Sequence, residues 1–142
     1  TNSIKSINIL FSTYTHLGIK IDFNCNKEKL SESSAYDAFI YKVCQESITN
    51  SIRHGKATQV EISINFENDS IKLSIVDNGK GCTKINKNFG LSRIVEYVSG
   101  INGKIQLSSK KNDGFKIDIE LPNNMEVSED KKIHEIYSGV VF

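Results

Sequence analysis

Residues 45 to 54 carry the side chains of this chain whose types and spacing best suit chemistry. They read Gln-Glu-Ser-Ile-Thr-Asn-Ser-Ile-Arg-His. Successive residues of an α-helix turn by about 100°, which places Glu46, Asn50 and Arg53 in one narrow stripe with His54 at its edge. The apolar side chains of this segment fall on the opposite side, where they can pack on a core. A carboxylate, an amide, a guanidinium and an imidazole on one face are the groups that a magnesium nucleotide needs.

A second polar element lies further along the chain, at the end of an expected strand. Residues 71–76 read Ile-Lys-Leu-Ser-Ile-Val, a partly alternating pattern typical of a strand, and lead into Asp77-Asn78-Gly79-Lys80-Gly81. Asp77 could accept a hydrogen bond from an exocyclic amine such as that of adenine. The two glycines would let the backbone approach a ligand closely. Asp-Asn-Gly is also an ordinary turn, so this segment alone leaves both interpretations open.

A third element, Asn88-Phe89-Gly90-Leu91, opens a helix expected at 89–99. Backbone amides at a helix start attract phosphate. The lysine-rich stretch 80–87 before it is either a solvated loop or a phosphate attractor. Taken in this order along the chain, the three elements indicate one nucleotide site.

In order and content, these elements resemble the GHKL ATPase superfamily, which contains sensor histidine kinases, gyrase-type topoisomerases, mismatch-repair ATPases and anti-sigma kinases. The resemblance covers about residues 17–122. Residues 45–57 are similar to the N box of histidine kinases, 77–81 to the G1 box and 88–91 to a reduced G2 box. The Gln-Glu opening, the His-Gly-Lys-Ala continuation and the short loop before Gly90 look most like the nitrate-sensor-like subclass.

The resemblance implies roles position by position, with ATP and Mg²⁺ as ligands. Glu46 would be the catalytic residue that polarises the attacking phosphoacceptor, and Asn50 would be the Mg²⁺ ligand. Arg53 and His54 would contact the phosphate side of ATP, and Asp77 would hold the adenine amine. The other implied ATP-binding residues lie in the two glycine-containing segments: Gly79, Gly81, Phe89, Gly90 and Leu91.

Three features depart from the family's pattern. Asn88 stands where many relatives have a first lid glycine, so the lid is expected to close differently. Phe115 follows Gly114 where the family usually has a threonine that helps to hold adenine through water, so that support is missing or replaced. The helix after the lid lacks the arginine-rich stretch of the subclass, so Arg93 inherits no role.

The implied fold is α/β, a two-layer Bergerat-type sandwich in which helices pack on one face of a mixed β-sheet. We expect residues 1–16 to be a linker or the end of a preceding dimerisation helix, 17–122 the ATP-binding catalytic domain, and 123–142 a C-terminal tail. Periodicity and breakers predict strands at 18–24, 58–66, 70–77, 104–109 and 115–121, and helices at 33–54 and 89–99. Ser33 is a plausible cap of the first helix and Gly55 its stop signal.

Composition agrees with one soluble domain. The 142 residues with 38% hydrophobic content allow a sizeable core. No apolar run approaches a membrane span and no signal-peptide pattern opens the chain. A formal charge of +1 with intermixed signs gives no nucleic-acid footprint. Cys25, Cys44 and Cys82 lack paired spacing, which indicates neither a disulfide framework nor a zinc site; Cys44 is expected in the core.

The expected function is the catalytic domain of a two-component sensor histidine kinase, which transfers the γ-phosphoryl group of Mg-ATP to a histidine on a separate dimerisation domain. His16 and His134 lie in no motif that resembles an acceptor helix. The resemblance implies two partners, the kinase's own dimerisation domain and a cognate response regulator. It also implies a cytoplasmic domain, not itself inserted in the membrane, of a membrane-anchored homodimer. The alternative is an ATP-dependent binding module, such as an anti-sigma serine kinase or a degenerate kinase.

Overall fold

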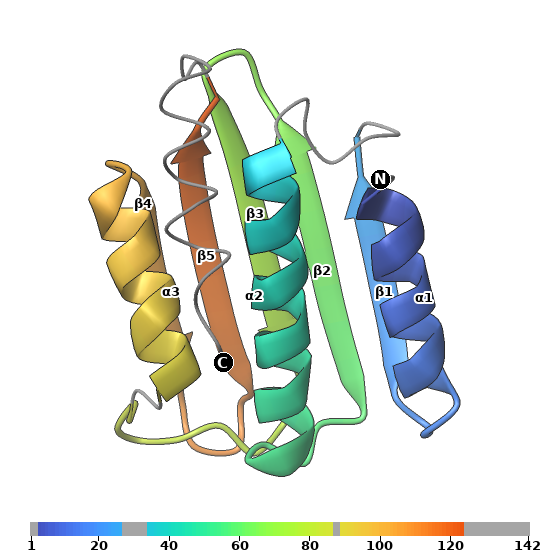
Figure 1. Ribbon diagram of the computed structural model, residues 1–142. Helices are drawn as coiled ribbons and strands as arrows, with labels where there is room; N and C mark the ends of the chain where they lie inside the picture. The colour runs from blue at the N-terminus through green and yellow to red at the C-terminus, as the bar shows by residue number, and fades with distance from the viewer. Residues whose placement is uncertain (1–2, 27–33, 87–88, 124–142) are drawn as a thin grey trace.

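The computed structural model describes residues 3–26, 34–86 and 89–123, which form a layer of helices packed on one face of a five-stranded sheet (Figure 1). This architecture confirms the expected two-layer α/β sandwich. In chain order its elements are α1 (Ser3–Thr15), β1 (Lys20–Cys25), α2 (Ser34–Arg53), β2 (Gln59–Phe66), β3 (Ser70–Asp77), α3 (Phe89–Gly100), β4 (Lys104–Ser109) and β5 (Phe115–Pro122).

The strand order brings the ends of several segments together at one end of the sheet. The order is β1-β2-β3-β5-β4, with β1 parallel to β2 and all other neighbours antiparallel. The parallel pair is joined through α2, as a parallel pair requires a crossover. In the central strands Asp77 lies opposite Val60 on one side and Phe115 on the other. The last turn of α2 reaches this same end of the sheet (Figure 1).

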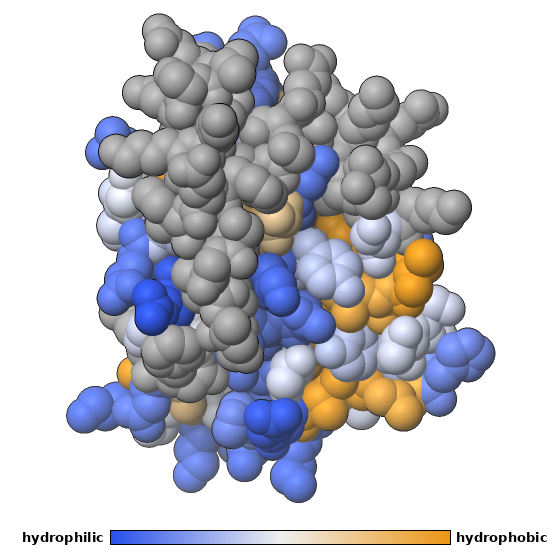
Figure 2. Space-filling model, in the orientation of Figure 1, coloured by the Kyte–Doolittle hydropathy of each residue, from blue (hydrophilic) through white to orange (hydrophobic). Residues whose placement is uncertain are grey.

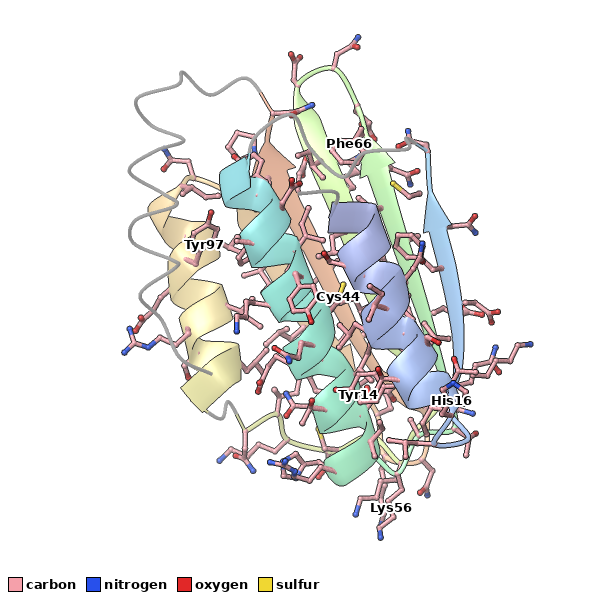
Figure 3. The ribbon with its side chains drawn as sticks, turned by 45° about the vertical axis from the view of Figure 1, so that its right-hand side comes forward. Tyr14, His16, Cys44, Lys56, Phe66 and Tyr97 are labelled. Atoms are coloured by element: carbon pink, nitrogen blue, oxygen red, sulfur yellow. The ribbon has the colours of Figure 1, made fainter. Side chains whose placement is uncertain are left out.

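The core lies between the helices and the sheet because both layers carry apolar side chains at the required period. On β2 and β3 every second residue is buried, as in Ile62 and Leu73. On α2 the buried positions recur at helical spacing and include Phe39 and Cys44. Phe39 stacks on Tyr97 of α3, which Figure 3 labels, with ring centroids 4.2 Å apart, and this contact joins the two helices.

Helix α1 belongs to the same core. Of the two alternatives expected for residues 1–16, a linker or a helix end, the structure shows a helix over Ser3–Thr15, in which Ile7, Leu10 and Phe11 are buried. The Tyr14 hydroxyl hydrogen-bonds to the Thr49 hydroxyl of α2 at 3.2 Å (Figure 3). Residues before 17 therefore contribute to the core, while the expected domain boundaries themselves stay predictions.

The solvent side of α1 is the most apolar surface in Figure 2, where hydrophobic colouring gathers over this helix. Among the described residues, Ile9 and Leu17 are the large hydrophobic side chains that lie exposed. No helix in the described ranges is both long enough and apolar enough to cross a membrane.

Two details at element ends differ from expectation. The first strand begins at Lys20 because residues 17 and 18 form a turn, in which Gly18 N–H donates to the Thr15 carbonyl at 3.0 Å. Helix α2 ends near Gly55 as expected, but the residue in the left-handed region is Lys56, with φ of 52°. Gly55 is needed for space instead, since a Cβ there would lie 2.9 Å from the Ser51 carbonyl oxygen. The predicted cap, Ser33, lies outside the described residues.

Candidate functional site

A cavity of about 440 Å³ lies at the end of the sandwich where α2, the loop after β3 and α3 converge. Its volume falls within the range typical of small-molecule sites. Residues from all three sequence elements line it: Asn50 from α2 and His54 directly after that helix, Asp77 at the end of β3 and Gly81 in the loop that follows, and Leu91 from α3. The structure therefore brings together elements that were grouped only by their order in the sequence.

Asp77 is held rigidly in the cavity wall by three protein donors. Its Oδ1 accepts from the backbone N–H groups of Gly79 at 2.9 Å and Phe115 at 3.1 Å. Its Oδ2 accepts from the Ser51 hydroxyl at 2.6 Å, a length typical of a charge-assisted bond. An ionised carboxylate only accepts hydrogen bonds. This wall of the cavity is therefore built to receive a donor from a ligand.

Phe115, which stands where the family usually has a threonine, supports Asp77 through its backbone. Although residue 115 lacks a hydroxyl, its N–H fixes Asp77, and its side chain lines the cavity with those of Ile75 and Ile117. The hydroxyl group next to the carboxylate comes from Ser51 on α2. This end of the cavity thus combines an apolar wall with one anchored acceptor.

The two glycines after Asp77 have different structural roles. A Cβ on Gly79 would lie 2.6 Å from the Gly55 carbonyl oxygen, so this glycine allows the loop to pack on the end of α2. Lys80 N–H donates to the same carbonyl at 2.8 Å, which fixes the loop there. Gly81 has φ of +60° and lines the cavity, and a side chain on it would collide with the Lys110 carbonyl. Gly81 thus contacts the cavity, whereas Gly79 shapes its support.

Glu46 lies outside the cavity lining, one helical turn before Asn50, and is partly buried against the start of α3. Gly90 is buried, and a Cβ on it would collide with the Glu46 carboxylate. Gly90 therefore packs closely against the predicted catalytic carboxylate, and a larger residue at this position would displace the Glu46 side chain. This contact was invisible in the sequence because it joins residues far apart along the chain.

The other predicted site residues lie at the rim of the cavity, outside its lining or outside the described side chains. Arg53 is exposed and does not line the cavity, and His54 is exposed at its rim. Phe89 begins α3, but its side chain lies outside what the structure describes. The Nη1 atom of Arg93 lies 3.9 Å from Oε2 of Glu96 on the same helix. An exposed ion pair of this kind contributes little to stability.

Several cavity residues were not among the individually predicted ATP-binding residues. Lys80 and Lys84 line it, which favours the phosphate-attracting interpretation of the lysine-rich loop. Ser47 and Ser51 also line it, and both are buried. Their signal was available, since two serines four residues apart lie on one helix face beside the polar stripe, but serine at such a border is usually ordinary helix surface.

Comparison with known proteins identifies the class that this fold and site define. The sequence matches the family described as Histidine kinase-, DNA gyrase B-, and HSP90-like ATPase over residues 36–125. That match covers more than half of the chain, so the protein belongs to this family.

Its relatives include bacterial signalling kinases. The chain is 30% identical over 122 residues to the signal transduction histidine-protein kinase/phosphatase DegS of Bacillus subtilis, covering 80% of this chain and 32% of DegS. It is 27% identical over 106 residues to the sensor histidine kinase LiaS of the same organism, covering 72% of this chain and 29% of LiaS. The chain thus spans about a third of the length of these curated relatives.

Solved structures agree on the fold. The catalytic domain of histidine kinase ThkA superposes with a TM-score of 0.64 at 18% identity, covering 87% of this chain and 93% of that domain. The histidine kinase domain of a blue-light activated kinase from Erythrobacter litoralis gives a TM-score of 0.63 at 15% identity, covering 87% of this chain and 60% of that one.

Proposed function

We propose that this chain is the ATP-binding catalytic domain of a sensor histidine kinase, which transfers the γ-phosphoryl group of Mg-ATP to a histidine on a separate dimerisation domain. The observation that carries this proposal is the anchored Asp77 acceptor at the apolar end of a cavity whose other residues include Asn50, Lys80 and Lys84. An adenine base fits the first part and phosphates fit the second.

The donor set of the cavity suits Mg-ATP. Ile75, Leu91 and Ile117 offer apolar surface to the faces of a flat base, while Asp77 offers an acceptor to its amine. Asn50 lines the cavity, and an amide oxygen is a hard ligand of the kind that Mg²⁺ binds together with nucleotide phosphates. Bound there, Mg²⁺ would neutralise phosphate charge.

Catalysis in this proposal is positioning and charge stabilisation. The acceptor imidazole attacks the γ-phosphorus in line, the bond to the β–γ bridging oxygen breaks, and ADP leaves. Glu46 orients the imidazole or takes its proton. His54 and Arg53 are assigned to the phosphate side; for Arg53, which is exposed, this role stays a prediction.

The larger assembly belongs to the same proposal. The whole kinase would be a membrane-anchored homodimer with this domain in the cytoplasm, and its phosphoryl group would pass from the dimerisation domain to a response regulator. The Gln-Glu opening and the His-Gly-Lys-Ala continuation support the nitrate-sensor-like subclass. The second candidate is an anti-sigma serine kinase or a degenerate binding module. The phosphorylated product distinguishes it from a histidine kinase, because phosphohistidine is acid-labile and phosphoserine is acid-stable.

Incubation with radiolabelled Mg-ATP tests the proposed reaction. We expect the chain to bind nucleotide without labelling itself, because we assign neither described histidine to an in-line acceptor position: His16 directly follows α1, and His54 directly follows α2 on the proposed phosphate side. Adding the dimerisation domain of the same kinase should label that partner, and the label should be acid-labile. A stoichiometric label on His16 or His134, or an acid-stable label on a partner serine, would contradict the proposal.

Thiol alkylation tests the cavity as the nucleotide site. Burial raises the pKa of the Cys44 thiol to about 12, and only the thiolate reacts. At pH 8 we expect iodoacetamide to leave Cys44 unmodified while it labels Cys82, which lines the cavity and is partly exposed. Mg-ATP should slow the labelling of Cys82. Cys25 on β1, outside the cavity lining, serves as the internal control, and equal protection of Cys25 and Cys82 would contradict the assignment.

A further inference from the structure

Two buried hydroxyl groups in the cavity wall have no role in the function proposed above. Among the residues that the structure describes, the buried polar side chains are Ser47 and Ser51, which are 4% and 5% exposed. Both line the cavity and lie one helical turn apart on α2. Burial of a hydroxyl carries a desolvation cost unless a hydrogen bond offsets it, so each group requires an explanation.

The Ser51 hydroxyl is explained by Asp77. It has one proton and two acceptors in reach, the Asp77 carboxylate at 2.6 Å and the Ser47 carbonyl oxygen at 2.8 Å. The bond to the carboxylate fixes the Oδ2 side of Asp77, as the two backbone amides fix the Oδ1 side. Ser51 therefore determines how the acceptor is presented to the cavity.

The Ser47 hydroxyl, in contrast, is unsatisfied. Its Oγ is fully buried and has no hydrogen-bond partner among the described residues. Buried hydroxyls without a partner are rare in native proteins, and this one belongs to a residue that lines the same cavity as Asp77. No water-sized group reaches this Oγ in the ligand-free chain, so a ligand or a ligand-bound water would satisfy it once the Ser47 side chain turns toward the cavity.

We propose that Ser47 and Ser51 form, with Asp77, the hydrogen-bonding surface that reads the edge of the purine base. Asp77 accepts from the 6-amino group, and Ser47 donates to the adjacent ring nitrogen N1, directly or through one water. Ser51 is a positioning residue that acts through Asp77. A 6-oxo purine presents an acceptor to the Asp77 carboxylate and is rejected there. This inference rests on the proposed nucleotide-binding function and deepens it.

The arrangement predicts opposite effects of Ser47→Ala on stability and on binding. The variant removes an unpaired buried hydroxyl, so the melting temperature of the ligand-free chain should be unchanged or higher. Its affinity for ATP should fall roughly 3- to 10-fold, the scale of one lost hydrogen bond. Ser74→Ala, on a partly buried residue of β3 outside this cavity, is the matched control and should change neither quantity.

Titration calorimetry with base analogues decides which atom Ser47 contacts. In 1-deaza-ATP the N1 acceptor is absent, so Ser47→Ala should weaken ATP binding and leave the already weaker binding of 1-deaza-ATP within about twofold of the parent. Equal weakening for both nucleotides, or no weakening for ATP, would overturn the Ser47 contact. If the parent binds neither nucleotide, the proposed function fails instead, which keeps the two failures distinct.

Ser51→Ala is expected to change the preference between two nucleotides. Without the hydroxyl, Asp77 is less firmly held, so the preference for ATP over purine riboside triphosphate, which lacks the 6-amino group, should shrink roughly 3- to 10-fold. A merely structural serine would lower the melting temperature without changing this preference. An unchanged preference would overturn the positioning role.

Discussion

Glu46→Gln is expected to slow phosphoryl transfer to the dimerisation domain by about 10²- to 10⁴-fold, the usual range for loss of a general acid–base group. Glutamine keeps the size of the side chain, so its packing against Gly90 at the start of α3 should survive. Glu46 does not line the cavity, and nucleotide affinity should therefore stay nearly unchanged. Label transfer and calorimetry on the same preparation measure the two quantities.

Asn50→Ala is the matched variant on the same helix face. Asn50 lines the cavity one turn from Glu46, and its amide oxygen is the α2 oxygen that we assign to Mg²⁺. This variant should lose the magnesium-dependent part of nucleotide affinity. If Glu46→Gln loses binding and keeps transfer, the two roles are reversed.

The second large effect is expected for Asp77→Asn, which should weaken ATP binding by about 1 to 3 kcal/mol, the scale of a lost hydrogen bond to a charged group. In this structure the variant can keep the protein hydrogen bonds around residue 77. The asparagine oxygen can accept from Gly79 and Phe115 as Oδ1 does, and its amino group can donate to the Ser51 hydroxyl. That hydroxyl then donates to the Ser47 carbonyl oxygen, 2.8 Å away.

The wall of the cavity would therefore keep its protein hydrogen bonds and change only what it offers to the base. A donor would stand where an acceptor stood, so the preference for ATP over GTP should also shrink. Asp77→Ala is a poorer test because it leaves two backbone amides without their acceptor. An Asp77→Asn chain with unchanged ATP affinity and unchanged melting temperature would remove Asp77 from base recognition.

Much of the site could be predicted because it depends on local periodicity. Helical spacing placed Glu46 and Asn50 on one face, and the strand pattern placed Asp77 at a strand end. The mixed sheet with helices on one face, in contrast, was expected from the family resemblance, because periodicity does not say which strands are neighbours.

What could not be predicted depends on contacts between distant segments. Gly79 is a glycine because the Gly55 backbone lies against it, and Gly90 packs against the Glu46 carboxylate. Residues 3–15 show scattered apolar positions whose burial requires the sheet edge and α2 to be present. Ser47 and Ser51 were not predicted, because the role of a serine on a helix can be assigned only when its hydrogen-bond partners are known.

Titration of the chain with ATP in the presence and absence of Mg²⁺, and with GTP under the same conditions, tests whether the cavity is an adenine nucleotide site. We predict saturable ATP binding at one site, tighter with Mg²⁺ because Asn50 can then bind the metal, and poor binding of GTP because Asp77 offers only an acceptor. Absence of saturable ATP binding, or comparable affinities for ATP and GTP, would contradict this assignment.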